Sequence, residues 1–236
     1  DLVMRSGTTI QSPDGADADK LAEPLRIQLS NASRLFAEAP GDIRIVQVDD
    51  DATINGVAKA VDTLYVANVL SSNGSVDIKV EQGDMTIDRV EAKFDSSLIA
   101  KANINDADSD DAAPIVNVAT GNLYIEATTG SIGKLSDHLD VSVGGTLDGW
   151  AGKDAYLNSP IDFNVGLFRA HSGLARLVTN GSIADLNGDP AADIEAKSLE
   201  LVAKDGTIGT LANPFEIDSS YASKGYVDAD AAKRVF

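Results

Sequence analysis

The sequence predicts an all-β fold, a right-handed parallel β-helix (β-solenoid) that runs through residues 1–236 as a single segment with degenerate repeats. Three observations predict it. Short runs alternate apolar and polar residues, turn-forming residues separate these runs, and one motif recurs along the chain. Many short strands also suit a β-sandwich or a mixed β fold, and this alternative stays open.

The expected strands are runs of three to six residues with apolar side chains on one side. In chain order they are residues 42–47, 76–80, 85–87, 123–125, 139–143, 161–165 and 199–201. Ile, Val and Leu are expected to point inward and to stack on the same position of the next coil. Asp, Lys and Thr are expected to point outward.

Glycine marks many of the expected corners. Gly41, Gly74, Gly130, Gly181 and Gly206 each stand shortly before an apolar run. We expect these glycines to supply the positive φ that a tight corner demands.

Two stretches carry apolar residues at a spacing close to that of a helix, namely residues 57–70 and the Ala-rich residues 29–39. The internal repeat argues against helices at both places, because it aligns Phe36 with segments rich in Gly and Ser. We therefore expect strands and loops there, with at most one short helix.

The recurring motif reads Leu, three residues, a large apolar residue, a polar residue and a β-branched residue. It occurs at residues 21–27, 135–141 and 211–217, and an aromatic residue follows nine positions later each time: Phe36, Trp150 and Tyr226. The motifs start 114 and 76 residues apart, and both spacings are multiples of 19. This predicts coils of that length, with the three aromatic residues packed at one equivalent corner.

Composition excludes several functions. Nineteen Lys and Arg against 37 Asp and Glu give a net charge of -18, which argues against binding nucleic acid through a basic face. Without cysteine, the chain has no disulfide, thiol nucleophile or Cys-ligated metal, and His138 and His171 are the only histidines. No apolar run approaches the roughly 20 residues that span a bilayer.

Gly-Ser-Ile-Gly at 130–133 and Gly-Thr-Ile-Gly at 206–209 are each followed by the Leu-x-x-x-[Leu/Phe]-x-[Val/Ile] motif. This arrangement resembles the repeats of filamentous-haemagglutinin-like adhesins and related giant repetitive proteins of bacterial surfaces. The resemblance implies a β-helical shaft, an extracellular or cell-surface location and a structural or adhesive role. Neighbouring repeats of the same polypeptide, and a cell-surface glycan or protein receptor, are the partners it implies.

The family's amino-terminal secretion domain carries Asn-Pro-Asn motifs, and Asn213-Pro214-Phe215 is the nearest match here. We therefore expect a shaft segment, excerpted from a longer array. A solenoid needs caps or further coils at its ends, so self-association through open strand edges is a further expectation.

Two acidic loops are candidate Ca²⁺ sites. Their alternating oxygen ligands come from Asp106, Asp108 and Asp110 in one loop, and from Asp185, Asn187 and Asp189 in the other. The second loop resembles the first part of a calcium loop but lacks the Gly at the sixth position and the bidentate Glu at the twelfth that an EF-hand requires. Further acidic stretches lie at 14–19 and 49–51, and the alternative is that all of these are solvated loops.

No catalytic residue is expected. The alternative function is a carbohydrate-active β-helix enzyme, a polysaccharide lyase or hydrolase, which needs strand-held carboxylates beside Arg or Lys. Asp77 and Asp162 are strand carboxylates, but the sequence places no basic residue beside Asp162. His138 aligns with prolines of the other copies and is expected in a loop, and His171 beside Ser172 is a weak basis for a triad.

Overall fold

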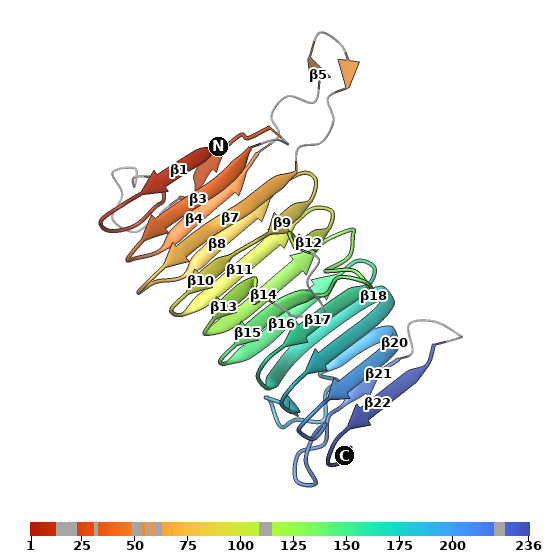
Figure 1. Cartoon of the computed structure of the whole chain (residues 1–236). Coiled ribbons are helices and arrows are strands. Elements are labelled where there is room, and N and C mark those ends of the chain that lie inside the picture. Colours follow the sequence, from red (N-terminus) through yellow and green to blue (C-terminus); the bar gives the residue numbers. More distant parts are fainter. Residues whose placement is uncertain are drawn as a thin grey trace.

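The chain folds into a stack of coils, and its strands run parallel from one coil to the next (Figure 1). The computed structural model describes residues 1–12, 23–30, 33–48, 53–54, 57–58, 63–108, 115–219 and 225–236. Twenty strands belong to one sheet network in which every strand pairing is parallel, and the described residues contain no helix. The predicted all-β parallel β-helix is therefore confirmed.

The coils have two long faces. The first face consists of β1 (Leu2–Arg5), β3 (Arg34–Ala39), β7 (Leu64–Ser71), β9 (Met85–Ile87), β10 (Val90–Ala92), β12 (Ile104–Asp106), β13 (Val118–Thr120), β15 (Leu139–Val143), β17 (Ala155–Ser159), the later parts of β18 (Phe163–Thr179) and β20 (Ile194–Ala203), and β22 (Val227–Ala231). The second face consists of β2 (Leu25–Ile27), β4 (Ile43–Gln47), β8 (Val76–Val80), β11 (Asp95–Ala100), β14 (Asn122–Ala127), β16 (Thr146–Ala151), the earlier parts of β18 and β20, β19 (Ile183–Asp185) and β21 (Ile217–Asp218). The pair β5 (Thr53–Ile54) and β6 (Val57–Ala58) forms a separate antiparallel sheet.

Aliphatic columns fill the space between the faces. Leu157, Leu177 and Leu201 are direct partners in successive coils, and none is more than 2% exposed. Phe163 and Phe168 are the largest fully buried side chains. Like residues thus stack on like residues, as the alternation predicts.

The predicted period of 19 residues is wrong. Partners in successive coils are as close as 18 residues apart, at Leu139 and Leu157, and as distant as 33 apart, at Leu2 and Leu35. The strands keep their register while the corners absorb extra residues, so coil length is not constant.

The predicted equivalence of the three aromatic residues fails for the same reason. Phe36 lies on β3 of the first face, Trp150 on β16 of the second face, and Tyr226 immediately precedes β22 and is half-exposed. A fixed offset in sequence maps to different places when the coils differ in length.

The described parts of both helix-like stretches are strands, as the repeat favoured. Between β3 and β7, Leu35 pairs with Val66 while Phe36 pairs with Asn68, so Ala67 of β7 is one extra residue in the ladder. This bulge shifts the inward positions from Leu64 and Val66 to Val69, and it thereby imitates helical spacing.

Asp and Asn side chains tie one coil to the next, most of them at or beside corners and Asp148 within β16. In six places, a side-chain Oδ1 accepts the N–H of the residue that follows a glycine one coil later. The pairs are Asp42 with Ser75 (3.0 Å), Asn103 with Ser131 (2.9 Å), Asn122 with Thr146 (2.8 Å), Asp148 with Leu167 (2.7 Å), Asp154 with Leu174 (2.8 Å) and Asp162 with Ser182 (2.6 Å). A Cβ on the intervening glycine would collide with the accepting oxygen in every case.

This crowding corrects the expected role of the corner glycines. The described glycines with positive φ are Gly83, Gly133, Gly188 and Gly209, and none of the five predicted corner glycines is among them. Gly74, Gly130 and Gly181 have no room for a Cβ, because it would meet an Asp or Asn side chain of the preceding coil.

Candidate functional site

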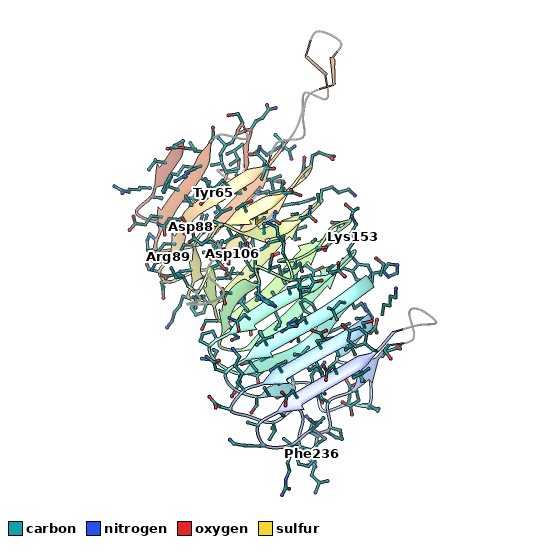
Figure 2. The ribbon with its side chains drawn as sticks, turned by 45° about the vertical axis from the view of Figure 1, so that its right-hand side comes forward. Tyr65, Asp88, Arg89, Asp106, Lys153 and Phe236 are labelled. Atoms are coloured by element: carbon teal, nitrogen blue, oxygen red, sulfur yellow. The ribbon has the colours of Figure 1, made fainter. Side chains whose placement is uncertain are left out.

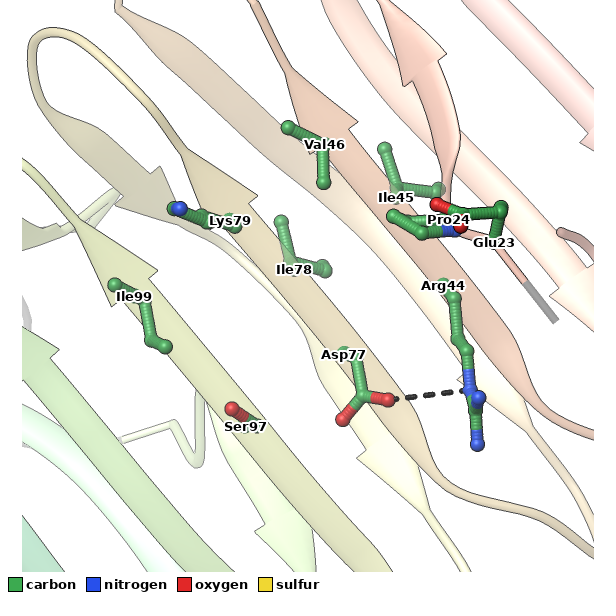
Figure 3. A pocket seen from close by; sticks show the side chains of 10 residues that line it. All are labelled: Glu23, Pro24, Arg44, Ile45, Val46, Asp77, Ile78, Lys79, Ser97 and Ile99. Atoms are coloured by element: carbon green, nitrogen blue, oxygen red, sulfur yellow. Dashed lines mark ion pairs between the residues drawn. The ribbon is translucent and has the colours of Figure 1, made fainter. Parts of the chain in front are cut away.

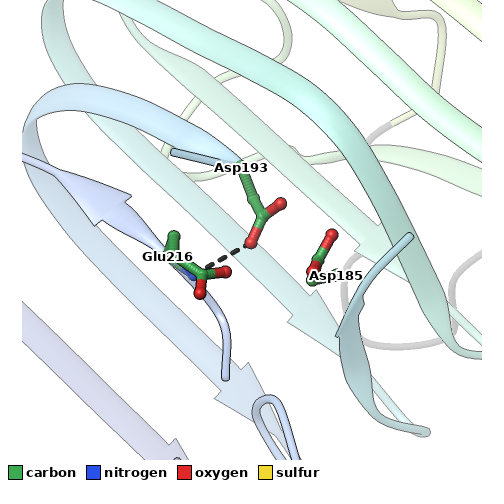
Figure 4. Close-up of side chains that lie close together, drawn as sticks. All are labelled: Asp185, Asp193 and Glu216. Atoms are coloured by element: carbon green, nitrogen blue, oxygen red, sulfur yellow. Dashed lines mark hydrogen bonds between the residues drawn. The ribbon is translucent and has the colours of Figure 1, made fainter. Parts of the chain in front are cut away.

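Three carboxylates converge where β19, β20 and β21 meet on the second face (Figure 4). Asp185, Asp193 and Glu216 each offer one oxygen, and these oxygens all lie within 4.8 Å of one another. Asp185 is 7% exposed and Asp193 only 2%, whereas Glu216 is partly buried. Among the described residues, this is the group whose geometry suits a bound cation.

Local structure positions the first two carboxylates. Asp185 ends β19 and accepts the N–H groups of Asn187 at 2.6 Å and Gly188 at 2.7 Å, which turns the chain sharply. Gly188 has a φ of 62°, so glycine suits this turn. Asp193 immediately precedes β20, and its Oδ2 accepts the N–H of Glu216 at 2.9 Å.

Electrostatics favour one retained proton in this cluster. Burial raises the pKa of Asp193 to about 7, and a hydrogen bond with Asp185 and the charges of Asp185 and Glu216 act in the same direction. The Glu216 N–H lowers this pKa but does not offset the other effects. Glu216 Oε2 is buried and has no hydrogen-bond partner in the described chain.

The other acidic loop repeats this arrangement with one change. Asp106 ends β12 and accepts the N–H of Asp108 at 2.9 Å, as Asp185 accepts that of Asn187. Asn117 immediately precedes β13 and accepts the N–H of Asp140 at 2.9 Å, as Asp193 accepts that of Glu216. The Asn117 amide then donates to Asp106 Oδ1 at 2.8 Å. A neutral amide therefore stands at the place that Asp193 occupies in the carboxylate cluster.

Tyr65, Asp88 and Arg89 lie in the neighbourhood of Asp106 (Figure 2). Burial, followed by the charge of Asp108, raises the pKa of Asp88, and the charges of Arg34 and Arg89 oppose this shift. Burial, followed by the charge of Asp88, raises the pKa of Tyr65.

The structure separates the predicted metal ligands. Asp185 belongs to the carboxylate cluster, but the Asn187 side-chain amide donates to the Gly166 carbonyl at 3.2 Å. Asp189 is exposed and accepts the N–H of Ala191 at 2.7 Å. Asp106 and Asp108 share one turn. Asp110 and the acidic stretches at 14–19 and 49–51 lie outside the described residues.

Asp193 and Glu216 are cluster members that the sequence analysis missed. The available signal was the position of Asp193 directly before an apolar run, which matches that of Asn117. The calcium prediction stays a prediction, since Ca²⁺ takes six to eight oxygens and the cluster supplies three carboxylates.

A second feature is a groove on the outer surface of the second face (Figure 3). It has a volume of about 400 Å³ and is lined by Glu23, Pro24, Arg44, Ile45, Val46, Asp77, Ile78, Lys79, Ser97 and Ile99. Arg44 Nε lies 3.3 Å from Asp77 Oδ2, and Arg44 also contacts Asp42 at 3.4 Å. Burial raises the pKa of Asp77, helped by the charges of Asp42 and Asp95 and opposed by that of Arg44.

The remaining candidate residues have structural contacts. Asp162 caps the N–H of Ser182 at a corner. His171 stacks on Trp150 with ring centroids 5.3 Å apart, while the Ser172 hydroxyl donates to the Gly152 carbonyl at 2.8 Å. His138 lies in the corner loop before β15 and meets Tyr156 edge to face at 6.0 Å.

Comparison of the chain with protein-family models, curated proteins and solved structures finds no match. In the part of the chain that the structure describes, no helix has the length and apolar character needed to cross a bilayer.

Proposed function

We propose that this chain is a non-enzymatic shaft segment of a large secreted bacterial surface protein, with a structural or adhesive role in cell-surface attachment or cell–cell contact. One observation carries the proposal: ten rungs of the first face pair in parallel succession from β1 to β22. The repeat motif's resemblance to bacterial surface adhesins supports it as well.

The physical basis is the mechanics of a stacked sheet. Neighbouring strands lie about 4.8 Å apart, so ten rungs extend on the order of 40 Å along the axis. Backbone hydrogen bonds run along this axis and the aliphatic columns resist bending, which suits a spacer between a cell surface and a contact. Lack of cysteine and strong acidity fit an extracellular protein that folds without disulfides, and they fit a cytosolic or salt-adapted protein as well.

Display on the surface of a non-adhesive bacterium tests this proposal. Cells that carry the chain on an anchor should attach to other cells, or to a host-cell layer, more often than cells that carry the anchor alone. A chain unfolded by a core substitution should lose the effect. Equal attachment with and without the folded chain would contradict an adhesive role.

The alternative function is a carbohydrate-active enzyme, and one observation favours it. The groove pairs the strand-held carboxylate Asp77 with Arg44 of the preceding coil, a combination that lyases and hydrolases of polysaccharides need. Incubation with a panel of acidic polysaccharides decides between the two functions. Turnover that is lost in Asp77→Asn would favour the enzyme.

A further inference from the structure

Four asparagines of this chain are followed directly by glycine, namely Asn55, Asn73, Asn180 and Asn187. Asn55 lies outside the described residues, and the other three are exposed in turns between strands. An asparagine before glycine can lose its side-chain amide without an enzyme, because glycine has no Cβ to hinder attack by its own backbone nitrogen. In a folded chain, the reaction depends on what holds that N–H and that side chain.

The pair Asn187-Gly188 is held at both reacting groups. The Gly188 N–H donates to Asp185 Oδ2 at 2.7 Å, and the Asn187 side-chain amide donates to the Gly166 carbonyl at 3.2 Å. The Asp185 carboxylate also disfavours loss of a proton from the neighbouring Gly188 nitrogen, because the resulting charge would be negative as well.

The pairs Asn73-Gly74 and Asn180-Gly181 are matched in sequence, since serine follows both. They differ in the attacking N–H. The Gly181 N–H donates to Thr179 Oγ1 at 2.9 Å, whereas the Gly74 N–H has no hydrogen-bond partner among the described residues. Gly74 is buried, and a buried backbone N–H without a partner is rare in folded proteins.

The N–H groups on either side of Gly74 are held in place. The Asn73 N–H donates to the Pro40 carbonyl at 2.7 Å, and the Ser75 N–H donates to Asp42 Oδ1 at 3.0 Å. The Gly74 nitrogen is therefore the one in this corner that no hydrogen bond keeps from the side chain before it.

Nearby charge also differs between the two matched corners. A carboxylate of the preceding coil lies beside each glycine, Asp42 beside Gly74 and Asp162 beside Gly181. Asp42 contacts Arg44 at 3.4 Å, whereas Asp162 makes no ion pair with any residue that the structure describes. Loss of a proton from the Gly74 nitrogen therefore meets less uncompensated negative charge.

We propose that Asn73 is a site of spontaneous deamidation, and that it reacts faster than the other described Asn-Gly pairs. Hydroxide removes the Gly74 N–H proton, the nitrogen attacks Asn73 Cγ, and the Cγ–Nδ2 bond breaks to release ammonia, which takes a proton from water. Water then opens the five-membered imide at either carbonyl and gives aspartate or isoaspartate. Either product adds one negative charge, and isoaspartate also adds a methylene group to the main chain between β7 and β8.

Incubation of the purified 236-residue chain at pH 8, followed by peptide mapping with mass spectrometry, tests the inference. The measurement is the rate at which the side-chain NH₂ is replaced by OH at each asparagine. In the folded chain, Asn73 should convert about fivefold faster than Asn180, because no N–H hydrogen bond has to break first, and Asn187 should be slowest. In the chain unfolded by urea, Asn73 and Asn180 should convert at similar rates, because the same two residues follow both.

Thr179→Val probes the protection of Asn180. The variant removes the acceptor of the Gly181 N–H and keeps the shape of the side chain, so conversion of Asn180 should rise about fivefold while that of Asn73 stays unchanged. The matched control Thr128→Val removes a hydroxyl that donates to a backbone carbonyl and holds no glycine N–H, and it should leave all rates unchanged. Circular dichroism melting curves show whether each variant folds, and the comparison of folded and unfolded wild type does not depend on them.

Equal rates at Asn73 and Asn180 in the folded wild type would overturn the inference. So would the absence of measurable conversion at Asn73 in the folded chain during the time that the unfolded chain needs for full conversion. The inference is independent of the proposed shaft role, since these rates are measured on the purified chain whether or not the displayed chain promotes attachment.

Discussion

The arrangements around the two acidic loops differ in the residue at one matching position, which is Asn117 in one and Asp193 in the other. Asn117 and Asp193 stand at matching positions, each directly before a strand, and each accepts a backbone N–H of the following coil. The amide of Asn117 also donates to Asp106, whereas an ionised Asp193 has no proton to give Asp185. A proton or a cation is therefore needed between Asp193 and Asp185, whereas the Asn117 amide already donates a hydrogen bond to Asp106.

Asp193→Asn should remove a pH dependence of stability. The folded-state pKa of Asp193 is raised from 3.8 to about 7, so the folded chain binds more protons than the unfolded chain between these values. The corresponding stability is fully present below about pH 4 and is lost as pH rises through about 7. After allowance for solvent screening, the loss is on the order of 2 kcal/mol.

Thermal unfolding of the wild type and of Asp193→Asn, at pH 5 and at pH 8, measures this pH-dependent loss of stability. The melting temperature of the wild type should fall relative to that of the variant as pH rises. An unchanged difference between the two proteins would contradict the proton-sharing arrangement.

The calcium prediction has its own test at the same residues. If the cluster around Asp185 binds Ca²⁺, millimolar Ca²⁺ should release or absorb heat at pH 8 and raise the melting temperature. Asp185→Asn should abolish both effects, because a carboxylate ligand is lost, whereas Asp189→Asn serves as a control because Asp189 is exposed and outside the cluster. No heat and no shift in the wild type would end the prediction.

Corner caps give a matched pair of substitutions. Asp162→Ala removes the acceptor of the Ser182 N–H and should lower the free energy of unfolding by about 1 kcal/mol, while Asp162→Asn keeps an acceptor and should cost less. Gly181→Ala should cost about 1–3 kcal/mol, because its Cβ meets the Asp162 side chain and backbone. Urea unfolding ranks the three, and a harmless Gly181→Ala would contradict the crowding argument.

At the level of elements, alternation identified the strands well because burial on one side is a local property. Residues 76–80, 85–87 and 139–143 are strands with the predicted bounds. The bulge at Ala67 left a misleading local pattern, because it imitates helical spacing. The alternation at residues 161–165 did not show that β18 continues for 17 residues from the second face to the first. The cluster was missed because Asp185 and Glu216 are brought together only by stacking.

Leu157→Ala tests the interior columns. Leu157 is fully buried between Leu139 and Leu177, so truncation should leave a cavity and cost about 2–5 kcal/mol of unfolding free energy. Ile161→Ala removes a comparable side chain from an exposed corner and should cost about 0.5 kcal/mol or less. Similar losses at both positions, measured by urea unfolding, would contradict the columnar core.

At the scale of the whole molecule, stability is distributed along the stack because each coil contacts only its neighbours. β15 and β17 have partners on both sides, whereas β22 pairs only with β20 among the described strands and most of its residues are exposed. Amide hydrogen exchange should therefore be slowest in β15 and β17 and fastest in β22. Uniform protection from β1 to β22 would instead indicate that the stack opens as one unit.

The hydrogen bonds from Asp and Asn side chains to the N–H groups that follow a glycine also have a direction. In all six, the side chain belongs to the earlier coil and the N–H to the later one. A chain emerging amino terminus first, from a ribosome or a narrow secretion pore, would present each template oxygen before the segment that needs it. Each coil that has folded would then offer its side-chain oxygens to the backbone N–H groups of the next coil, so folding can proceed coil by coil from the amino terminus.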